Sequence, residues 1–288
     1  MTVAAASVLC PINGLPARLY CRKGSAFYYI EPSSGTIFQA EMPSVSAMKQ
    51  YADDEYSSGV YREYAKSRDL KIATARPRLD GIKQRTTGKR LLDVGCGTGF
   101  FMEAAAEAGF EVRGVEFSAV AISLARQDIR ERIVRGDVNQ LLRNETEKFD
   151  VVTAFDIIEH VQNPANFLQE LREILQPGGV LAISSPDTGH VLRYLMGAKW
   201  PMLQPLQHTV LFSQRSIAAL LERSGFQDVQ VETAHKVLTM DYLADQLTAT
   251  NTGLNKAYQS LSWIVPGPLR CKPVAVNIGE FIAYARRI

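Results

Sequence analysis

One short segment constrains the fold of this chain more than any other: an apolar run that ends in a glycine-rich turn. Residues 90–94 have the composition of a short strand, and glycines follow at positions 95, 97 and 99. Residues 100–108 are helical in composition and are closed by Gly109. A strand, a glycine turn and a helix in immediate succession let the backbone approach a ligand closely. A turn with glycines for steric reasons alone is the alternative.

The chain after residue 88 alternates between strand-like and helix-like segments. This alternation predicts an α/β protein with a doubly wound, mostly parallel sheet of seven strands and helices on both faces. Ligands of such sheets bind beyond the carboxyl ends of the strands. The expected strands are 90–94, 111–116, 132–135, 150–155, 180–184, 229–232 and 281–285, and the expected helices are 100–108, 119–130, 164–175 and 216–224.

Composition and charge exclude several classes of protein. The 288 residues include 32 Lys and Arg against 30 Asp and Glu, so the net charge of +2 provides no basic surface for nucleic acid or an acidic membrane. No uncharged apolar run approaches the ~20 residues of a membrane-spanning helix. Residues 1–17 lack the basic start of a signal peptide. Four cysteines are too few for a disulfide scaffold, so we expect a reduced, cytoplasmic protein.

An acidic residue, Asp93, stands two positions before the first glycine of the turn. A carboxylate there would repel a pyrophosphate and attract a cationic ligand. The run closely resembles the first motif of the class I S-adenosylmethionine-dependent methyltransferases. The resemblance implies a Rossmann-like methyltransferase fold, with S-adenosylmethionine as methyl donor and S-adenosylhomocysteine as product. It places the ammonium of the ligand at Asp93, directly or through water, and its methionine portion at the turn residues Gly95, Cys96, Gly97 and Gly99. Ordering the turn is the alternative role of Asp93.

Later positions match further motifs of that family. By the resemblance, Glu116 accepts hydrogen bonds from both ribose hydroxyls, and Phe117 packs on the adenine. Asp137 takes the adenine amino group, with the backbone of Val138 at the edge of the ring. A helix or turn cap is the alternative role of Asp137. The backbone around Phe155 is expected to line the methionine arm.

The chain divides into three expected parts. Residues 1–44 resemble a degenerate zinc ribbon, residues 45–88 a helical lid or linker, and residues 89–288 the methyltransferase domain. Two insertions, near 186–213 and 236–275, interrupt this domain. Structureless loops of this length are uncommon unless they are functional, so both are expected to wall the acceptor pocket.

The zinc-ribbon resemblance depends on paired motifs in which four cysteines hold the metal. Here only Cys10 keeps a ligand, because Asn13, Glu31 and Ser34 stand in the other places. Structural zinc needs four nitrogen or sulfur ligands. We therefore expect a metal-free β-hairpin unit, and a chance similarity is the alternative.

Methyl transfer from a sulfonium depends largely on positioning, and a base is needed only where the acceptor must lose a proton. His208 lies beyond the fifth expected strand, in a loop that resembles the histidine loop of ubiquinone-type O-methyltransferases. A histidine of ordinary pKa suits a hydroxyl acceptor. A structural loop histidine is the alternative, and His160 is the second candidate base.

A divalent cation is an alternative use of the residues after the fourth expected strand. Asp156, Glu159 and His160 are spaced to share one helical face, and the matching positions of ubiquinone-type enzymes are linked to such a cation. Aspartate replaces glutamate at the first position, and the Glu-His pair is also common in methyltransferases without metal. We expect no metal here.

The sequence thus predicts a methyltransferase that acts on a small molecule, at a hydroxyl group, in natural-product or glycan biosynthesis. An N- or C-methyltransferase of the same fold and a non-catalytic cofactor-binding regulator are the alternatives. Nucleic-acid methylation is disfavoured, because no Asn-Pro-Pro-Tyr or Asp-Pro-Pro-Tyr motif follows the fourth strand. The expected partner is a small-molecule substrate, with a homodimer left open.

Overall fold

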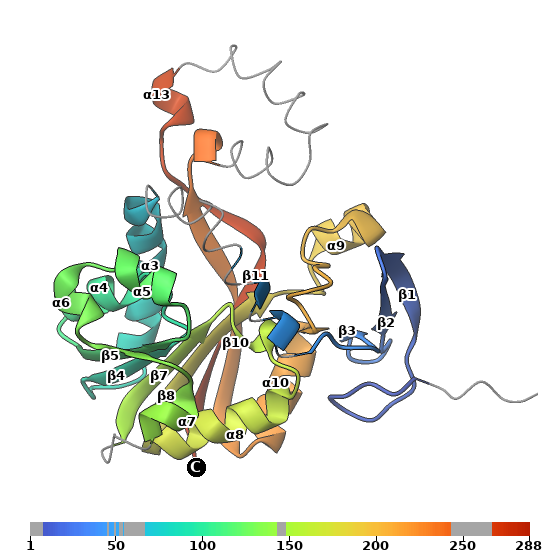
Figure 1. The fold of residues 1–288 in the computed structure, drawn as a ribbon, viewed down its shortest axis with the longest axis horizontal. Coiled ribbons are helices and arrows are strands. Elements are labelled where there is room, and N and C mark those ends of the chain that lie inside the picture. Colours follow the sequence, from blue (N-terminus) through green and yellow to red (C-terminus); the bar gives the residue numbers. More distant parts are fainter. Residues whose placement is uncertain are drawn as a thin grey trace, which may run out of the picture.

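The computed structural model contains the central sheet that the alternation predicts (Figure 1). It describes residues 8–44, 46–48, 50–51, 54, 67–142, 148–242 and 267–288. From one edge to the other, the strands are β10 (Phe226–Leu238), β11 (Val274–Arg287), β8 (Leu175–Pro186), β7 (Phe149–Phe155), β4 (Arg90–Val94), β5 (Glu111–Glu116) and β6 (Ile133–Arg135). β11 runs opposite to the other six strands, so its pairings with β8 and β10 are antiparallel and the remaining pairings are parallel. The predicted α/β, mostly parallel, seven-stranded architecture is confirmed.

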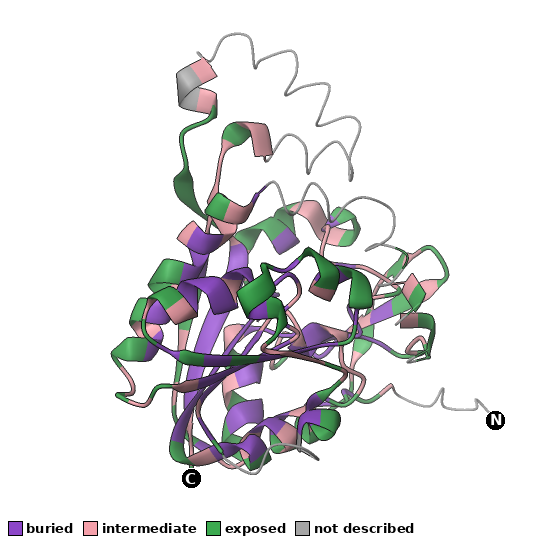
Figure 2. Ribbon diagram, turned by 60° about the vertical axis from the view of Figure 1, so that its left-hand side comes forward, coloured by how far each residue is buried: buried purple, intermediate pink, exposed green. Residues whose placement is uncertain are grey.

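Helices cover both faces of this sheet, and two hydrophobic clusters mark the two faces. Because successive side chains of a strand point to opposite faces, Leu92 belongs to one cluster and Leu91 to the other. The central strands are therefore buried on both sides, as Figure 2 shows. The first face packs against α7 (Val138–Leu142), α8 (Pro164–Ile174) and α10 (Gln214–Arg223), and the second against α3 (Arg68–Lys83), α4 (Phe100–Glu107) and α6 (Gln127–Arg130).

The single helix expected over residues 119–130 is wrong. The chain instead forms α5 (Ala119–Leu124) and then α6, with Ala125 and Arg126 extended between them at ψ 148° and 141°. The guanidinium of Arg130 donates to the carbonyl oxygens of Ser123 and Ala125, at 2.7 and 2.8 Å. Carbonyls that are satisfied by a side chain do not need the next turn of helix, which explains the interruption.

The last two strands are much longer than the expected 229–232 and 281–285. β10 and β11 form a hairpin that extends beyond the sheet and leads to α13 (Gly267–Arg270) (Figure 1). Their pairing shifts register between Ala234 and Lys236. Such irregularities re-aim side chains and are frequent next to active sites.

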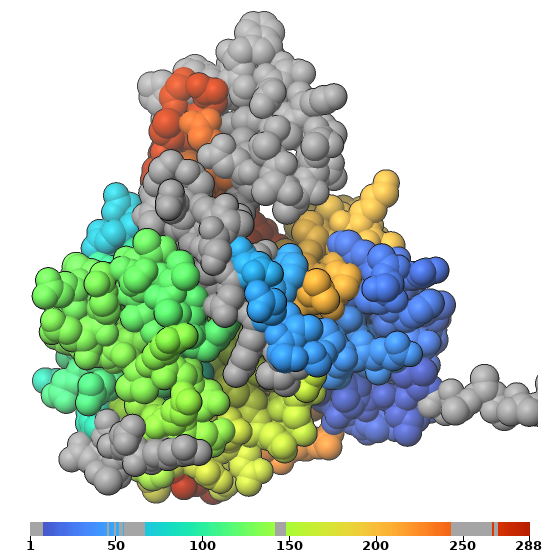
Figure 3. All heavy atoms as spheres, viewed as in Figure 1, coloured from blue at the N-terminus to red at the C-terminus, as the bar shows by residue number. Residues whose placement is uncertain are grey.

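The N-terminal residues form a second, smaller sheet. It contains β1 (Arg18–Lys23), β2 (Ala26–Ile30) and β3 (Ile37–Gln39), and β9 (Val210–Leu211) completes it. β9 belongs to the first insertion, which also forms α9 (Val191–Met196) and the short turn η2 (Gly197–Lys199). Figure 3 shows the N-terminal residues in blue beside this golden segment. The first insertion therefore packs on the N-terminal sheet. The domain boundary expected at residue 44 stays a prediction.

Two loops of the N-terminal segment have matching backbone geometry. The N–H of Gly14 donates to the carbonyl of Cys10, and the N–H of Gly35 donates to the carbonyl of Glu31, each at 2.9 Å. Both glycines have positive φ, 72° and 73°. The loops are therefore two copies of one tight turn.

A carboxylate joins these two turns. Glu31 accepts hydrogen bonds from the Nδ2 of Asn13 at 2.9 Å and from the backbone N–H groups of Ser33 and Ser34 at 2.7 and 2.8 Å. Burial alone would raise the pKa of Glu31, but these hydrogen bonds outweigh it and lower the pKa to about 2. Asn13, Glu31 and Ser34, which stand at three of the four ligand positions of the zinc-ribbon pattern, therefore meet through hydrogen bonds. The resemblance to a zinc ribbon stays a prediction.

None of the helices in the described ranges combines the length and the apolar character that crossing a bilayer requires.

Candidate active site

The glycine turn after β4 has the geometry that its sequence predicts. Gly95, Gly97 and Gly99 have positive φ of 70°, 56° and 76°, a region that favours glycine. A Cβ at Gly95 would lie 2.2 Å from the Cδ1 of Ile157, whereas a Cβ at Gly97 would meet no described atom within 4 Å. Packing therefore requires glycine at position 95, and the open side of Gly97 leaves its backbone accessible to a ligand.

Glu116, at the carboxyl end of β5, holds this turn in place. Its buried carboxylate accepts hydrogen bonds from the N–H groups of Gly97 and Ser118, both at 2.9 Å. A carboxylate can accept several hydrogen bonds, so the predicted ribose contacts are compatible with these two. Phe117 follows at the surface, 36% exposed, where an adenine could pack on it.

Asp93 is buried at the base of the turn. The Oγ1 of Thr153 donates to its Oδ1 at 2.7 Å. Burial raises the pKa of Asp93 to about 7, although the bond from Thr153 opposes this shift. A carboxyl group in this state gains stabilisation when a cation arrives beside it. The site therefore fits a ligand ammonium.

Arg78 reaches the same place from α3. Its guanidinium lies 4.6 Å from the centroid of the Phe155 ring, and Phe101 meets that ring edge-on with centroids 4.8 Å apart. The Nε and Nη2 of Arg78 are buried and have no hydrogen-bond acceptor among the described residues. Buried donors without an acceptor are costly, and a guanidinium pairs best with a carboxylate. Asp93 and Arg78 thus fit the two ends of an amino-acid zwitterion.

Asp137, which follows β6, has the capping role that the sequence left open as the alternative to a contact with adenine. The Oδ1 of Asp137 accepts from the N–H of Gln140 at 3.0 Å, and the Oε1 of Gln140 accepts from the N–H of Asp137 at 3.2 Å. Asp137 therefore caps α7, whose first residue, Val138, is buried. The contact of Asp137 with adenine stays a prediction.

A pocket opens between the glycine turn, α3 and the end of β10. The residues that it takes from the predicted cofactor set are Asp93, Gly95, Cys96 and Phe155. Other described lining residues include Lys71, Thr74 and Arg78 from α3, Asp156 after β7, and Lys236, Val237 and Leu238 from β10.

The two insertions differ in their relation to this pocket. The start of the second insertion lines it, whereas no described residue of 186–213 does. Residues 243–266 of the second insertion, and residues 55–66 of the expected lid, lie outside the described ranges.

A row of alternating charges adjoins the pocket, and three of its members, Asp156, Lys236 and Arg78, line it. The Oδ1 of Asp156 accepts from the Oγ of Ser184 at 2.8 Å, and its Oδ2 accepts from the Nζ of Lys236 at 3.3 Å. Lys236 also contacts the carboxylate of Glu280, whose Oε2 lies 3.7 Å from the Nη2 of Arg78. Asp156 has a φ of 57°, which is rare outside glycine and often marks a functional site.

The candidate bases His208 and His160 lie together, with ring centroids 4.8 Å apart. The Nδ1 of His208 donates to the carbonyl of Met202 at 2.6 Å, and the Nδ1 of His160 donates to that of Gln207 at 3.2 Å. Because a carbonyl only accepts, each neutral ring carries its hydrogen on Nδ1 and keeps a lone pair on Nε2. Neither histidine is among the described lining residues of the pocket.

The ordinary pKa expected of His208 does not fit its surroundings. Burial lowers the pKa of His208 to about 3, with a further contribution from His160. Burial also lowers the pKa of His160. Both rings are therefore neutral at neutral pH, and whether either acts as a base stays a prediction.

The residues that could share a metal differ from the expected set. Glu159, His160 and His208 bring ligand atoms within 4.8 Å of one another, and within the described ranges they are the one such group. Asp156 is not part of it, because it pairs with Lys236 and Ser184. η1 (Ile158–His160) is a short 3₁₀ turn, so the expected common face of an α-helix is not formed. Whether a metal binds here stays a prediction.

Sequence reasoning missed Lys236 and Glu280. The sixth strand was expected to end at residue 232, although apolar residues at 229, 231 and 237 continue the alternation. Extending that strand would have brought Lys236 to the carboxyl edge of the sheet. Nothing in the sequence pairs Glu280 with it, because 44 positions separate the two residues.

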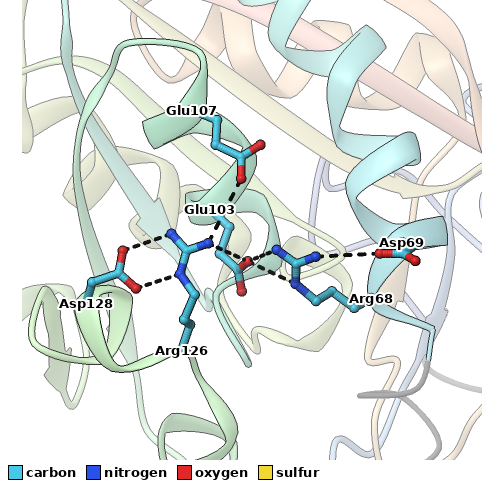
Figure 4. A network of polar contacts seen from close by, with 6 residues as sticks. All are labelled: Arg68, Asp69, Glu103, Glu107, Arg126 and Asp128. Atoms are coloured by element: carbon cyan, nitrogen blue, oxygen red, sulfur yellow. Dashed lines mark hydrogen bonds and ion pairs between the residues drawn. The ribbon is translucent and has the colours of Figure 1, made fainter.

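α3 is fixed over the site by a buried carboxylate on α4 (Figure 4). Glu103, 1% exposed, contacts the guanidinium of Arg68 at the start of α3. It also lies 3.3 Å from Arg126, whose Nε donates to Asp128 at 2.5 Å. This network ties the helix that carries Arg78 to the helix that follows the glycine turn.

Comparison with known families supports the interpretation of this geometry. Residues 62–231 match the model of a family described as a methyltransferase domain. Among curated proteins, the ubiquinone biosynthesis O-methyltransferase of Actinobacillus pleuropneumoniae serotype 7 (strain AP76) is 38% identical over 120 residues, which cover 38% of this chain and 51% of the relative. That of Hahella chejuensis is 37% identical over 115 residues, covering 38% and 48%. The chain thus spans about half the length of these relatives.

Solved structures share the fold. An S-adenosylmethionine-dependent methyltransferase from Archaeoglobus fulgidus superposes with a TM-score of 0.53 at 20% identity, over 79% of this chain and 98% of that one. A methyltransferase from Bacillus halodurans gives a TM-score of 0.50 at 23% identity, over 73% and 97%. At such identities the likeness shows the fold alone.

Proposed function

Because the chain belongs to the methyltransferase-domain family, we propose that it transfers a methyl group from S-adenosylmethionine to a hydroxyl group of a small molecule. The observation that carries the proposal is that Asp93 and Arg78 line one pocket together with residues of the glycine turn. One offers a carboxyl for an ammonium and the other offers unsatisfied donors for a carboxylate. A nicotinamide dinucleotide has no such pair of groups.

The remaining cofactor contacts follow the family motifs. Glu116 holds the ribose, Phe117 packs on the adenine, and Asp137 and Val138 meet the edge of the adenine ring. The support is positional: Glu116, Asp137 and the backbone at Phe155 stand at or just after the carboxyl ends of β5, β6 and β7.

A hydroxyl acceptor is supported by the curated relatives, which are named O-methyltransferases. Those names concern ubiquinone biosynthesis, whereas the sequence alone favoured natural-product or glycan acceptors; both stay as acceptor classes to be tested. N- or C-methylation and a regulator without turnover are the alternatives. A cytoplasmic location belongs to the proposal because the four cysteines suit a reduced protein, and a homodimer stays open.

The transfer forms a carbon–oxygen bond and breaks the methyl–sulfur bond, whose electron pair stays on sulfur. The acceptor must also lose a proton, and we keep His208 and His160 as the candidate bases. Their neutral state leaves a lone pair on each Nε2. If His208 is the base, His208→Ala lowers kcat by about 10²–10⁴ and hardly changes cofactor affinity.

The test is transfer of an isotopically labelled methyl group to matched acceptors, such as a phenol and the corresponding aniline. The proposal expects label on the hydroxyl compound. Label on the amine alone would replace it with N-methylation. Binding of S-adenosylhomocysteine without transfer to any acceptor would favour the regulator. His160→Ala is run beside His208→Ala, and full activity of both variants would remove the histidines from the mechanism.

A further inference from the structure

The ammonium of Lys236 is held by two carboxylates at the wall of the pocket. Its Nζ donates to the Oδ2 of Asp156 at 3.3 Å and also contacts the Oε1 of Glu280. An ammonium has three N–H donors, so these two contacts leave one. Lys236 is also a lining residue of the pocket, and its side chain is 21% exposed.

The charge of Lys236 is stable in this place. Burial would lower the pKa of Lys236, but the carboxylates of Asp156 and Glu280 outweigh burial and raise it above its usual range. Arg78, facing it from α3, opposes this shift. Lys236 is therefore a fixed cation at neutral pH and cannot act as a base.

Asp156, the carboxylate that pairs with Lys236, cannot act as the base either. Burial would raise the pKa of Asp156, but Lys236 and Arg78 outweigh burial and lower it below its usual range. A carboxylate with so little affinity for a proton orients its neighbours but does not remove a proton from a hydroxyl group. With these described charged groups around it, Lys236 can contribute to catalysis by stabilising a negative charge.

The position of Lys236 matches the reacting end of the cofactor site. Its partner Asp156 directly follows Phe155, and Asp156, Phe155 and Gly95 line the same pocket as Lys236. The glycine turn, expected at the methionine portion, and the cation thus face one space. An acceptor that enters this space places its reacting atom near both.

We propose that Lys236 is a catalytic residue, whose remaining N–H donates to the acceptor oxygen and stabilises the oxyanion that attacks the methyl group. The inference rests on the proposed hydroxyl transfer but on neither histidine. The O–H bond of the acceptor breaks, its proton passes to water in the open pocket, and the electron pair stays on oxygen. That pair then forms the new bond to carbon. Donors fixed where charge develops typically contribute 10²–10³ in rate.

The proposal selects a class of acceptor. A fixed cation promotes ionisation only of a hydroxyl that can ionise near neutral pH, which means an acidic hydroxyl such as a phenol or an enol. A sugar or alkyl alcohol would gain much less. Glu280 is a positioning residue in this account, because it orients the ammonium without facing the acceptor.

A binding experiment tests this without turnover. 4-Nitrophenol is titrated with the protein in the presence of S-adenosylhomocysteine, and its ionised form is followed by absorbance as a function of pH. The wild type should lower the pKa of the bound phenol by at least one unit. Lys236→Met should abolish this shift, and Lys236→Arg should keep most of it. Lys89→Met, which removes an exposed lysine at the opposite end of β4, is the matched control.

The pH profile of the rate separates this role from a structural one. With a phenol that the wild type methylates, Lys236→Met should lower kcat about 100-fold at pH 7 and recover toward the wild-type rate at high pH, where the acceptor ionises unaided. Calorimetry with S-adenosylhomocysteine checks that the variant is folded, and its affinity should be unchanged. An equal loss of kcat at every pH, or an unshifted bound phenol in the wild type, would overturn the proposal. Absence of transfer to any hydroxyl by the wild type would instead overturn the proposed function.

Discussion

The two ends of the pocket are built in different ways. Most of the cofactor end comes from one continuous stretch, in which β4, the glycine turn and β5 lie within 27 residues, from Arg90 to Glu116, and Arg78 joins it from α3. The acceptor end takes Asp156 from the residue after β7, Lys236 from β10 and Glu280 from β11. The first is held mainly by backbone geometry and short-range hydrogen bonds, and the second by ion pairs between residues of distant strands.

This difference shows where specificity can change. A turn that depends on positive φ and on Glu116 tolerates little substitution without losing the ligand. Charges placed on long strands can be exchanged while the sheet stays intact. We therefore expect substitutions at the cofactor end to act on binding, and substitutions at the acceptor end to act on rate.

The largest effect on ligand binding is expected from a methyl group added at Gly95, in the glycine turn of the cofactor end. In Gly95→Ala the new Cβ meets Ile157 at 2.2 Å, and φ stays at +70°, so the turn must move. We expect binding of S-adenosylhomocysteine to weaken at least about 100-fold, or about 2.7 kcal/mol, by calorimetry. The control is Gly24→Ala in the β1–β2 hairpin, where φ is +61° and no described atom lies within 4 Å. It should lower Tm through the backbone cost, about 1–2 kcal/mol, and leave affinity unchanged. Equal affinity of both variants would contradict the account.

Glu116→Ala is the next largest expected effect. It removes the acceptor of the Gly97 and Ser118 N–H groups as well as the proposed ribose contacts. We expect at least tenfold weaker binding, about 1.4 kcal/mol. Glu111→Ala, at the exposed start of the same strand, should have no effect. An unchanged affinity in Glu116→Ala would separate this residue from the ligand.

Much of the cofactor end could be predicted from the sequence, because its residues lie close together along the chain in one motif. The spacing of Asp93 and Gly95 predicts a turn that the structure contains. The acceptor end could not be read in this way. Glu280 meets Lys236 only because β11 enters the sheet antiparallel beside β10, a pairing that the residues around either position do not encode. The sequence predicted a β-hairpin in the N-terminal segment, but it did not predict the strand that completes the small sheet, because β9 lies far along the chain from β3.

Asp93 makes the cofactor end sensitive to pH. Burial raises its pKa to about 7 from an ordinary value of 3.8, so the folded chain binds a proton that the unfolded chain has lost. The stability of the free protein should therefore fall as pH rises from about 4 to about 7. Binding of a ligand ammonium favours the ionised form, so affinity for S-adenosylhomocysteine should rise over pH 6 to 8. Melting curves and calorimetry of the wild type and Asp93→Asn measure both trends, and Asp93→Asn should lose both. Trends of opposite sign would show that Asp93 does not face a cation.

The smallest expected effect concerns metal in the N-terminal segment. Elemental analysis should find less than about 0.2 zinc per chain, because one thiol cannot fill a tetrahedral site. Glu31, hydrogen-bonded to Asn13 and Ser34, links the turns instead. Cys10→Ser should accordingly leave the metal content unchanged. Stoichiometric zinc that is lost in this variant would contradict the prediction.

The central claim is that the glycine turn, with Asp93 and Arg78, binds an adenosyl amino acid. Calorimetric titration of the wild type with S-adenosylhomocysteine, beside NADH, tests it most directly. The account predicts a Kd for S-adenosylhomocysteine in the micromolar range or tighter, about −8 kcal/mol, and no binding of NADH. Binding of NADH without binding of S-adenosylhomocysteine would contradict it.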